Sequence, residues 1–163
     1  MRLALFQPDI PQNLGAAIRL CACLGVLLDV IAPCAFPLSS RQLKRAALDY
    51  GDKADVRLHD SWSAFLEAPE RRDGRLILFT TRAQASYADF AYQAGDTLLF
   101  GSESAGAPEA VHTAAVARLT IPLLPGLRSL NVVTAAAMGL GEALRRTNGF
   151  SPMSSVLIEA APE

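Results

Sequence analysis

The sequence predicts an α/β fold in a single domain, with a parallel sheet at its centre. Three observations predict it: short β-rich runs recur along the chain, a segment of helical character follows each run, and the 163 residues suffice for one hydrophobic core. When strands alternate with helices, each helix returns the chain to the same edge of the sheet, so the strands run parallel. A core of this size needs no metal or disulfide to hold it.

Six β-rich runs are expected to form the strands. In chain order they are Leu3–Phe6, Leu28–Ile31, Asp55–Leu58, Leu76–Thr80, Thr97–Phe100 and Leu119–Ile121. The expected helices are Asn13–Leu24, Ser40–Tyr50, Ser61–Ala68, Gln84–Ala91, Pro108–Val116 and Asn131–Arg146. Asn13, Ser40 and Ser61 are residue types that favour helix N-caps. Pro108 suits the first turn of a helix.

The helix expected at Asn131–Arg146 is apolar on nearly every side over its first three turns, with small residues that permit close packing. Such a helix lies either in the core or in an oligomer interface. Residues 147–163 contain Gly149, Pro152 and Pro162 and are expected to form a loosely attached tail. The domain is therefore expected to span residues 1–146.

The composition argues against several classes of protein. Hydrophobic residues make up 51% and the mean hydropathy is +0.24, so part of the surface is expected to close against another subunit. Asp29 and Glu142 interrupt the strongest apolar stretches, and no transmembrane helix is expected. The N-terminus turns polar at Gln7, before the core of a signal peptide could develop, so the cytoplasm is the expected compartment.

Charge and cysteine content argue against two further classes, nonspecific nucleic-acid binders and zinc proteins. A formal net charge of -1 argues against a protein that coats nucleic acid nonspecifically, so any RNA contact requires a local basic patch. The three cysteines are Cys21, Cys23 and Cys34, an odd number at a spacing that suits zinc poorly. We expect buried free thiols and no metal site.

The first segment that carries chemistry is residues 7–19, between the first strand and the body of the first helix. Ligands gather at the carboxyl ends of parallel strands, so this loop is placed for function. Gly15 and Arg19 lie four residues apart, on one helical face, where a partner at the bare backbone of Gly15 would meet the guanidinium. Asn13 as a plain cap and Arg19 as a surface charge remain the structural alternative.

The second segment is residues 98–108, a buried strand that breaks into a glycine loop. Glu103 occupies the place of the middle glycine of a dinucleotide loop, and its carboxylate would repel a pyrophosphate. A carboxylate at a strand end better suits a ligand with hydroxyls or positive charge, such as S-adenosylmethionine. A tight turn with a solvated glutamate is the alternative.

The third segment is residues 121–131, a strand end and a loop that opens the last helix. Two prolines restrict its backbone and Gly126 permits a sharp reversal, which predicts a rigid loop with free amides at a helix N-terminus. Such a loop can bind the edge of an adenine. Ser129 or Asn131 can also serve as the N-cap, which does not exclude a binding role.

In this order, the patterns N-x-G-x-x-x-R, F-G-x-E-x-x-G and I-P-x-x-P-x-x-x-S-L-N resemble the three motifs of the SpoU branch of the SPOUT methyltransferases. Residues 41–50 look like the tRNA-facing segment of the short, single-domain tRNA (cytidine/uridine) wobble 2'-O-methyltransferases. The resemblance covers residues 1–146.

This resemblance implies a six-stranded parallel sheet whose C-terminal part forms a deep trefoil knot, one of the rare exceptions to unknotted topology. It implies that S-adenosylmethionine binds in the knot, and that the first-motif helix and the last helix form a homodimer interface. The cofactor-binding residues that it implies are Phe79, Gly101, Glu103, Ile121, Leu123, Ser129 and Leu130.

The implied activity is methylation of the 2'-hydroxyl of the wobble ribose, cytidine or uridine 34, of tRNA. Family precedent offers Arg19 as the base, whereas a guanidinium with a pKa above about 12 is better suited to stabilise the developing alkoxide or to hold a phosphate. Asn13, Ser129 and Asn131 complete the expected catalytic set as orienting residues. The anticodon stem-loop is expected to contact Arg41, Lys44, Arg45 and Tyr50.

Other functions stay open at this point. The same enzyme class can methylate another tRNA or ribosomal RNA site, and a knotted protein without catalysis can bind RNA through the basic segment. An oxidoreductase with a nucleotide cofactor is disfavoured because no G-x-G-x-x-G pattern follows a strand.

Overall fold

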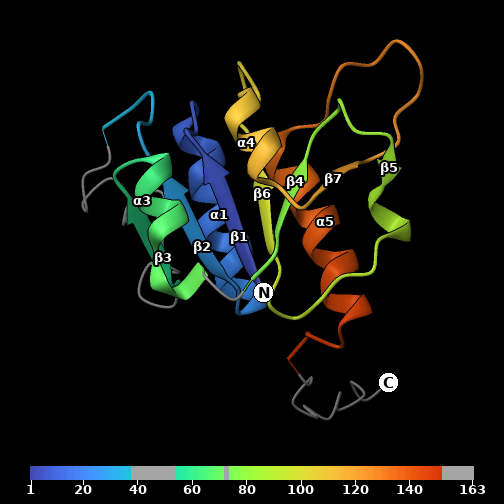
Figure 1. Ribbon diagram of the computed structural model, residues 1–163, viewed down its shortest axis with the longest axis horizontal. Coiled ribbons are helices and arrows are strands. Elements are labelled where there is room, and N and C mark those ends of the chain that lie inside the picture. The colour runs from blue at the N-terminus through green and yellow to red at the C-terminus, as the bar shows by residue number, and fades with distance from the viewer. Residues whose placement is uncertain (38–53, 72–73, 152–163) are drawn as a thin grey trace, which may run out of the picture.

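The computed structural model describes residues 1–37, 54–71 and 74–151, and its strands form one parallel sheet (Figure 1). In chain order the strands are β1 (Arg2–Phe6), β2 (Leu27–Ile31), β3 (Val56–His59), β4 (Leu76–Phe79), β5 (Ala85–Ser86), β6 (Thr97–Phe100) and β7 (Ala117–Thr120). Their order within the sheet is β3-β2-β1-β6-β4-β7-β5. Because every pair is parallel, the carboxyl ends of all strands lie along the same edge.

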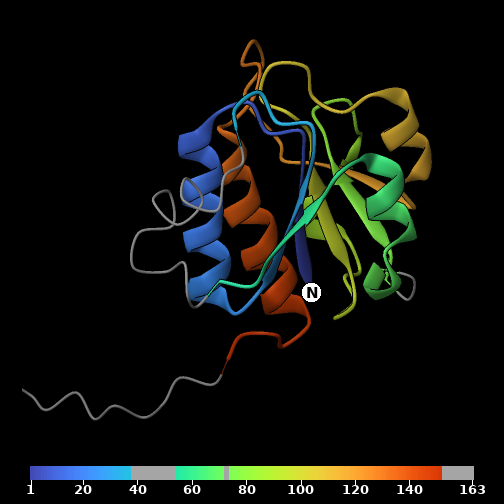
Figure 2. The same cartoon turned by 90° about the vertical axis from the view of Figure 1, so that its left-hand side faces the viewer.

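The helices of the described residues cover both faces of the sheet. They are α1 (Pro11–Leu24), α3 (Trp62–Glu67), α4 (Glu109–Ala114) and α5 (Val132–Arg146), with the 3-10 turns η2 (Pro69–Arg71) and η3 (Tyr87–Asp89). Figure 2 shows α1 and α5 side by side on one face, with α3 and α4 on the other. This three-layer arrangement is the expected α/β class.

The central strand β1 divides the core into two clusters. Leu3 and Leu5 pack in the cluster beneath α1 and α5, whereas Ala4 and Phe6 pack in the cluster beneath α3 and α4. Successive strand residues point to opposite faces, and here both faces are covered. A strand at this position therefore needs an unbroken apolar run, which is why β1, β4 and β6 could be recognised in the sequence.

The segment after β4 contradicts two expectations. Residues 84–91 do not form a helix: Ala85–Ser86 pair with β7 as the short strand β5, and only the η3 turn follows. The sheet therefore has seven strands rather than six. Tyr87 and Tyr92 in this segment pack against the core beneath α5, and their burial outweighs a weak local preference for helix.

Helix starts follow the expectations in part. The hydroxyl of Ser61 accepts a hydrogen bond from the N–H of Ala64 at 3.1 Å, which confirms its role as N-cap of α3. Asn131 caps α5 in the same way, by accepting from the N–H groups of Val133 and Thr134. Asn13 is not a cap, because α1 already begins at Pro11, after Ile10. Its side chain is thereby available for other contacts.

The helix α5 lies in the core with one face only. Ala136, Leu140 and Ala143 are fully buried, whereas Met138 is 38% exposed. A Cβ atom added at Gly139 would come within 2.8 Å of the Phe79 ring, so this position requires a residue without a side chain. None of the helices in the described ranges is long and apolar enough to cross a membrane.

Asp29 is a fully buried carboxylate in the sheet, and the sequence showed it only as a break in an apolar run. It lies in β2, with no exposed surface, and accepts two hydrogen bonds from the Arg2 guanidinium at 2.7 and 2.8 Å. The His59 Nε2 atom lies 2.7 Å from the same carboxylate. Three neighbouring strands are thus joined by side chains as well as by their backbones.

The expectation that all three cysteines are buried is wrong. All three cysteines are free, but only Cys21 is buried, and Cys23 is exposed on α1. Burial and the nearby Asp29 raise the pKa of Cys21 to about 12. The expected helix at Ser40–Tyr50 and most of the expected tail lie outside the described residues.

Candidate active-site pocket

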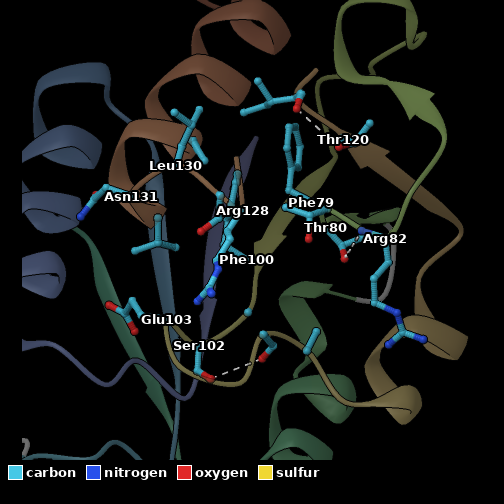
Figure 3. A pocket seen from close by; sticks show the side chains of 18 of the residues that line it. Phe79, Thr80, Arg82, Phe100, Ser102, Glu103, Thr120, Arg128, Leu130 and Asn131 are labelled. Carbon is cyan, nitrogen blue, oxygen red and sulfur yellow. Dashed lines mark hydrogen bonds between the residues drawn. The ribbon is translucent and has the colours of Figure 1, made fainter. Parts of the chain in front are cut away.

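A pocket of about 580 Å³ opens at the carboxyl edge of the sheet, where the loops after β4, β6 and β7 meet the start of α5 (Figure 3). Phe79 ends β4 and Phe100 ends β6, and their rings stack at a centroid distance of 4.7 Å on its wall. Ligands in parallel sheets bind at this edge, because the connecting loops can diverge there to leave a crevice.

The pocket brings together the three segments that were singled out in the sequence. Nine of the residues expected to act in catalysis or cofactor binding line it, although up to 118 positions separate them in the chain. These residues are Asn13, Phe79, Gly101, Glu103, Ile121, Leu123, Ser129, Leu130 and Asn131. Of the expected set within the described residues, only Arg19 does not line the pocket.

The loop after β6 is a closed, rigid turn. Ser102 and Gly106 exchange two backbone hydrogen bonds of 3.0 and 2.9 Å, which closes the loop upon itself. A Cβ atom added at Gly101 would lie 2.4 Å from the backbone carbon of Gly106, so the two ends approach as only glycine allows. The tip of this turn presents Glu103.

The Glu103 carboxylate joins the first two segments. Its Oε1 atom accepts a hydrogen bond from the Asn13 side chain at 2.7 Å, and its Oε2 atom accepts one from the backbone N–H of Asp9 at 2.8 Å. Both donors are neutral. The Glu103 carboxylate therefore has neutral hydrogen-bond donors, and its oxygens have lone pairs for further donors.

Asn13 links Glu103 to the third segment. Its side-chain oxygen accepts a hydrogen bond from the Asn131 amide at 3.0 Å. The Asn131 oxygen in turn caps α5, through the N–H of Val133 at 2.9 Å. A continuous chain of hydrogen bonds therefore runs from Glu103 through Asn13 and Asn131 to the N-terminus of α5, and each side chain is oriented by the next.

The loop that follows β7 forms the remaining wall. Gly126 adopts a φ of +87°, a left-handed conformation that favours glycine, and confirms the sharp reversal expected there. Leu124 and Leu127 of this loop are 75% and 64% exposed, while Ile121 and Leu123 line the pocket. The wall is thus apolar on its inner side, which suits a flat heterocyclic ring.

Other lining residues were not anticipated from the sequence. Arg128 extends into the pocket (Figure 3), and Arg82 lies at its edge, 3.4 Å from Glu109. His112 lines it from α4 and is only 4% exposed. Arg128 could have been suspected, since it directly precedes Ser129, but the positions of Arg82 and His112 depend on how the loops after β4 and β6 fold together.

Arg19 lies on the exposed side of α1. It is six residues from Asn13, which corresponds to about 9 Å along a helix axis. The neighbouring Gly15 is buried in the same helix, so the expected approach of a partner to its bare backbone is not possible in the folded chain. The expected RNA-binding residues Arg41, Lys44, Arg45 and Tyr50 lie outside the described residues.

The chemistry of the pocket suits an organic ligand. Among the described residues, no group of three histidine, cysteine or acidic side chains could hold a metal ion. The lining combines apolar side chains, one carboxylate, two amides, two guanidinium groups and an imidazole. Apolar walls with a few fixed polar groups are typical of small-molecule sites.

Comparison with known proteins gives consistent matches over most of the chain. Residues 1–141 match the SpoU rRNA Methylase family. A protein of Beijerinckia indica named tRNA (cytidine(34)-2'-O)-methyltransferase is 52% identical over 149 residues, which cover 91% of this chain and 93% of the relative. The relative of the same name in Escherichia coli is 37% identical over 148 residues, covering 90% and 93%.

Solved structures agree with these relatives. One that concerns the 2-OH methylation of C/U34 on tRNA superimposes with a TM-score of 0.83 at 46% identity, covering 91% of this chain and 96% of the other. The SpoU methyltransferase AviRb of Streptomyces viridochromogenes, solved in complex with the cofactor AdoMet, has a TM-score of 0.80 at 24% identity. It covers 90% of this chain and 60% of that protein, and at this identity it supports the fold alone.

Proposed function

The chain belongs to the SpoU rRNA methylase family, and we propose that it transfers a methyl group from S-adenosylmethionine to the 2'-hydroxyl of the wobble ribose of tRNA. The observation that carries this proposal is the near full-length similarity, at 52% identity, to a tRNA (cytidine(34)-2'-O)-methyltransferase. The substrate nucleoside is cytidine or uridine 34, as in the similar solved structure.

The pocket residues fit this cofactor by their chemistry. Apolar Ile121, Leu123 and Leu130 suit the adenine, while Gly101 lets the loop after β6 close tightly upon itself at the pocket. The Glu103 carboxylate, which is held by neutral donors, suits a ligand that carries a sulfonium and an ammonium group. Phe79 and Ser129 complete the proposed cofactor-binding set.

We also propose that the C-terminal part of the domain, within residues 1–146, forms the trefoil knot that its sequence resemblance implies. The strand order supports this, because β6, β4 and β7 are neighbours although β4 precedes β6 in the chain. The loop after β7 also lies against the loops after β4 and β6 at the pocket.

In the proposed reaction the cofactor supplies an electrophilic methyl group, which the ribose 2'-oxygen takes as the carbon–sulfur bond breaks. The protein contributes mainly position, and Asn13 and Asn131 hold the pocket side of α1 and the start of α5 in register. The proton of the hydroxyl passes to water. Arg19 stabilises the oxygen as it becomes negative, or holds the adjacent phosphate, because a guanidinium is too weak a base to take the proton.

The position of Arg19 makes a homodimer part of this proposal. Within one chain Arg19 is exposed on α1 and does not line the pocket. A second subunit that packs against α1 and α5 can carry its own Arg19 to the pocket. In this assembly the basic residues Arg41, Lys44, Arg45 and Tyr50 of one or both subunits hold the anticodon stem-loop.

The direct test is methylation of an anticodon stem-loop, of full tRNA and of ribosomal RNA fragments, with mass-spectrometric mapping of the product. Methyl groups are expected only at the 2'-oxygen of nucleotide 34. Product confined to ribosomal RNA, or to a tRNA site outside the anticodon loop, would refute the proposed substrate while leaving the family unchanged.

A second test addresses Arg19 and the dimer together. Arg19→Ala and Asn131→Ala homodimers are both expected to be inactive while Arg19→Ala binds S-adenosylhomocysteine normally. If Arg19 acts across the interface, mixed dimers of the two variants regain one intact site and about half the activity of wild-type dimers, because one pocket then has all its groups. Mixed dimers that stay inactive would place Arg19 and Asn131 in the same functional unit of one chain.

A further inference from the structure

The segment after β1 and the turn after β6 are joined by a second contact, beside the one through Glu103. The Asp9 carboxylate accepts a hydrogen bond from the backbone N–H of Ser104 at 2.9 Å and another from the Ser104 hydroxyl at 2.5 Å. In return, the backbone N–H of Asp9 donates to Glu103. Each segment therefore both donates to and accepts from the other, and we call this reciprocal contact the Asp9 clasp.

Neither side of the clasp is held in place by the sheet alone. Asp9 lies between β1 and α1, after Gln7, which adopts a positive φ of 49°. Ser104 lies at the tip of the turn that Ser102 and Gly106 close. Since tips of turns on exposed loops are the parts that move most easily, a contact at the tip decides where Glu103 points.

The charge of Asp9 strengthens the clasp. Its hydrogen bonds from Ser104 lower the pKa of the carboxyl below its ordinary value, so Asp9 is ionised at every pH at which the protein is expected to work. Hydrogen bonds to an ionised acceptor are roughly twice as strong as those between neutral groups. The clasp is therefore made of charge-assisted hydrogen bonds, although Ser104 itself is exposed.

We propose that Asp9 is a positioning residue for methyl transfer, which holds Ser104 and thereby keeps Glu103 in the orientation that binds Asn13. This inference rests on the proposed function, because methyl transfer is the activity to be measured. The hydrogen bonds themselves do not depend on it. Glu103 has to accept from Asp9 and Asn13 at once, and the distance between these donors is set by the turn of chain from Asp9 to α1. Without the clasp, Ser104 is no longer held by Asp9, and the turn that carries Glu103 is free to shift.

The expected consequence is a loss in kcat rather than in cofactor binding. Asp9 is not among the residues that line the pocket, and Asp9→Ala leaves the Glu103 carboxylate in place. Because S-adenosylhomocysteine also has no sulfonium group, we expect its affinity to change little. Small displacements of groups that align reacting atoms can lower rates by up to about 100-fold. For Asp9→Ala we expect kcat to fall about 10- to 30-fold, with the KM for tRNA and the Kd for S-adenosylhomocysteine changed by less than about threefold.

Matched variants separate positioning from general damage. Asp9→Asn keeps an oxygen that can accept from Ser104, so it should recover most of the lost kcat. Ser104→Ala removes the hydroxyl but not the backbone donor, and a loss of about threefold is expected. Asp55→Ala is the control, since Asp55 is an exposed carboxylate before β3, at the opposite edge of the sheet, and its kcat should equal that of the wild type.

A double-mutant cycle gives the sharpest reading, because residues that act through one contact are not additive. The Asp9→Ala, Ser104→Ala double variant should have a kcat within about twofold of Asp9→Ala alone. The proposal is overturned if the two losses multiply, if Asp9→Ala keeps its kcat within twofold of wild type, or if cofactor affinity and melting temperature fall in parallel with kcat.

The proposal and the proposed function can fail separately. If the wild-type protein methylates none of the RNAs tested, hydrogen exchange still reports on the clasp. The amides of Asp9 and Ser104 are expected to exchange slowly in the wild type and quickly in Asp9→Ala, with β1 and β6 protected in both. Fast exchange of both amides in the wild type would overturn the clasp, whatever the enzyme methylates.

Discussion

Two carboxylates in this protein, Asp29 and Glu103, are each held by donors from distant parts of the chain, but the donors differ in charge. Asp29 is completely buried in β2 and faces the cationic Arg2 guanidinium and the ring of His59. Among the described residues, Glu103 at the pocket accepts hydrogen bonds from the Asn13 amide and from the backbone N–H of Asp9. One carboxylate is thus paired with a cationic side chain inside the protein, and the other is held by neutral donors.

This difference indicates what each carboxylate is for. A buried charge is costly unless a cation and hydrogen bonds compensate for it, and such a group then serves the fold. A half-buried carboxylate with neutral donors is fixed in direction but is not neutralised, so it can still attract a positively charged ligand. Stability should depend on the first group and activity on the second, and the following experiments test this separation.

The largest effect is expected from Arg2→Ala. Asp29 would lose two hydrogen bonds and its main cation while it stays buried, which should lower the free energy of unfolding by about 3–5 kcal/mol. Urea denaturation measures this change. As a control, Arg145→Ala removes an exposed partner of Glu142 within α5 and should leave the free energy of unfolding nearly unchanged. A loss below about 1 kcal/mol for Arg2→Ala would contradict the role assigned to Asp29.

Glu103→Gln should lower the activity strongly and the stability only slightly, the opposite of Arg2→Ala. Glutamine can accept from Asn13 or from the Asp9 N–H but not from both, and it carries no charge. We expect kcat to fall about 100-fold, equivalent to about 2.7 kcal/mol in the barrier, with the free energy of unfolding lowered by less than about 1 kcal/mol. Steady-state kinetics and urea denaturation on the same preparation give both values. Equal losses of stability in Glu103→Gln and Arg2→Ala would remove the distinction.

Ligand binding should stabilise the protein independently of Asp29. S-adenosylhomocysteine at thirtyfold its Kd should raise the free energy of unfolding by about 2 kcal/mol, because it binds only the folded protein. The same increment is expected in Arg2→Ala, since effects at separate sites add. Thermal or urea unfolding with and without the ligand provides the measurement. An increment that disappears in Arg2→Ala would mean that the two regions are coupled.

The smallest effect concerns the pKa of Cys34, which depends on the negative charges beside the pocket. Burial, Asp9 and Glu103 together raise the pKa of this thiol to about 11. A raised pKa disfavours the thiolate, so removing the negative charge in Glu103→Gln should lower the pKa and increase the thiolate fraction. Alkylation of Cys34 at pH 9 should then be about two- to threefold faster, as peptide mass spectrometry would detect. The exposed Cys23 is the internal control, and an unchanged rate at Cys34 would indicate that Glu103 is already neutralised.

Local patterns in the sequence determined most of the architecture. The strands β1, β4 and β6 have unbroken apolar runs because both faces of the sheet are covered, and Ser61 and Asn131 are N-caps because their short side chains reach the first free amides. Three short motifs also contain eight of the nine expected residues that line the pocket. Such features can be recognised in the sequence because each depends on residues that are neighbours in the chain.

Contacts between distant segments were decided only by the tertiary structure. Residues 84–91 became a strand and a turn because β7 offered an unpaired edge and the core accepted two tyrosine rings. Asp29 could be recognised as part of the fold only once β1 and β3 placed Arg2 and His59 beside it. Asp9 and Ser104 are 95 positions apart, and no local pattern links them. Their pairing follows from the parallel sheet, which sets the carboxyl ends of β1 and β6 side by side.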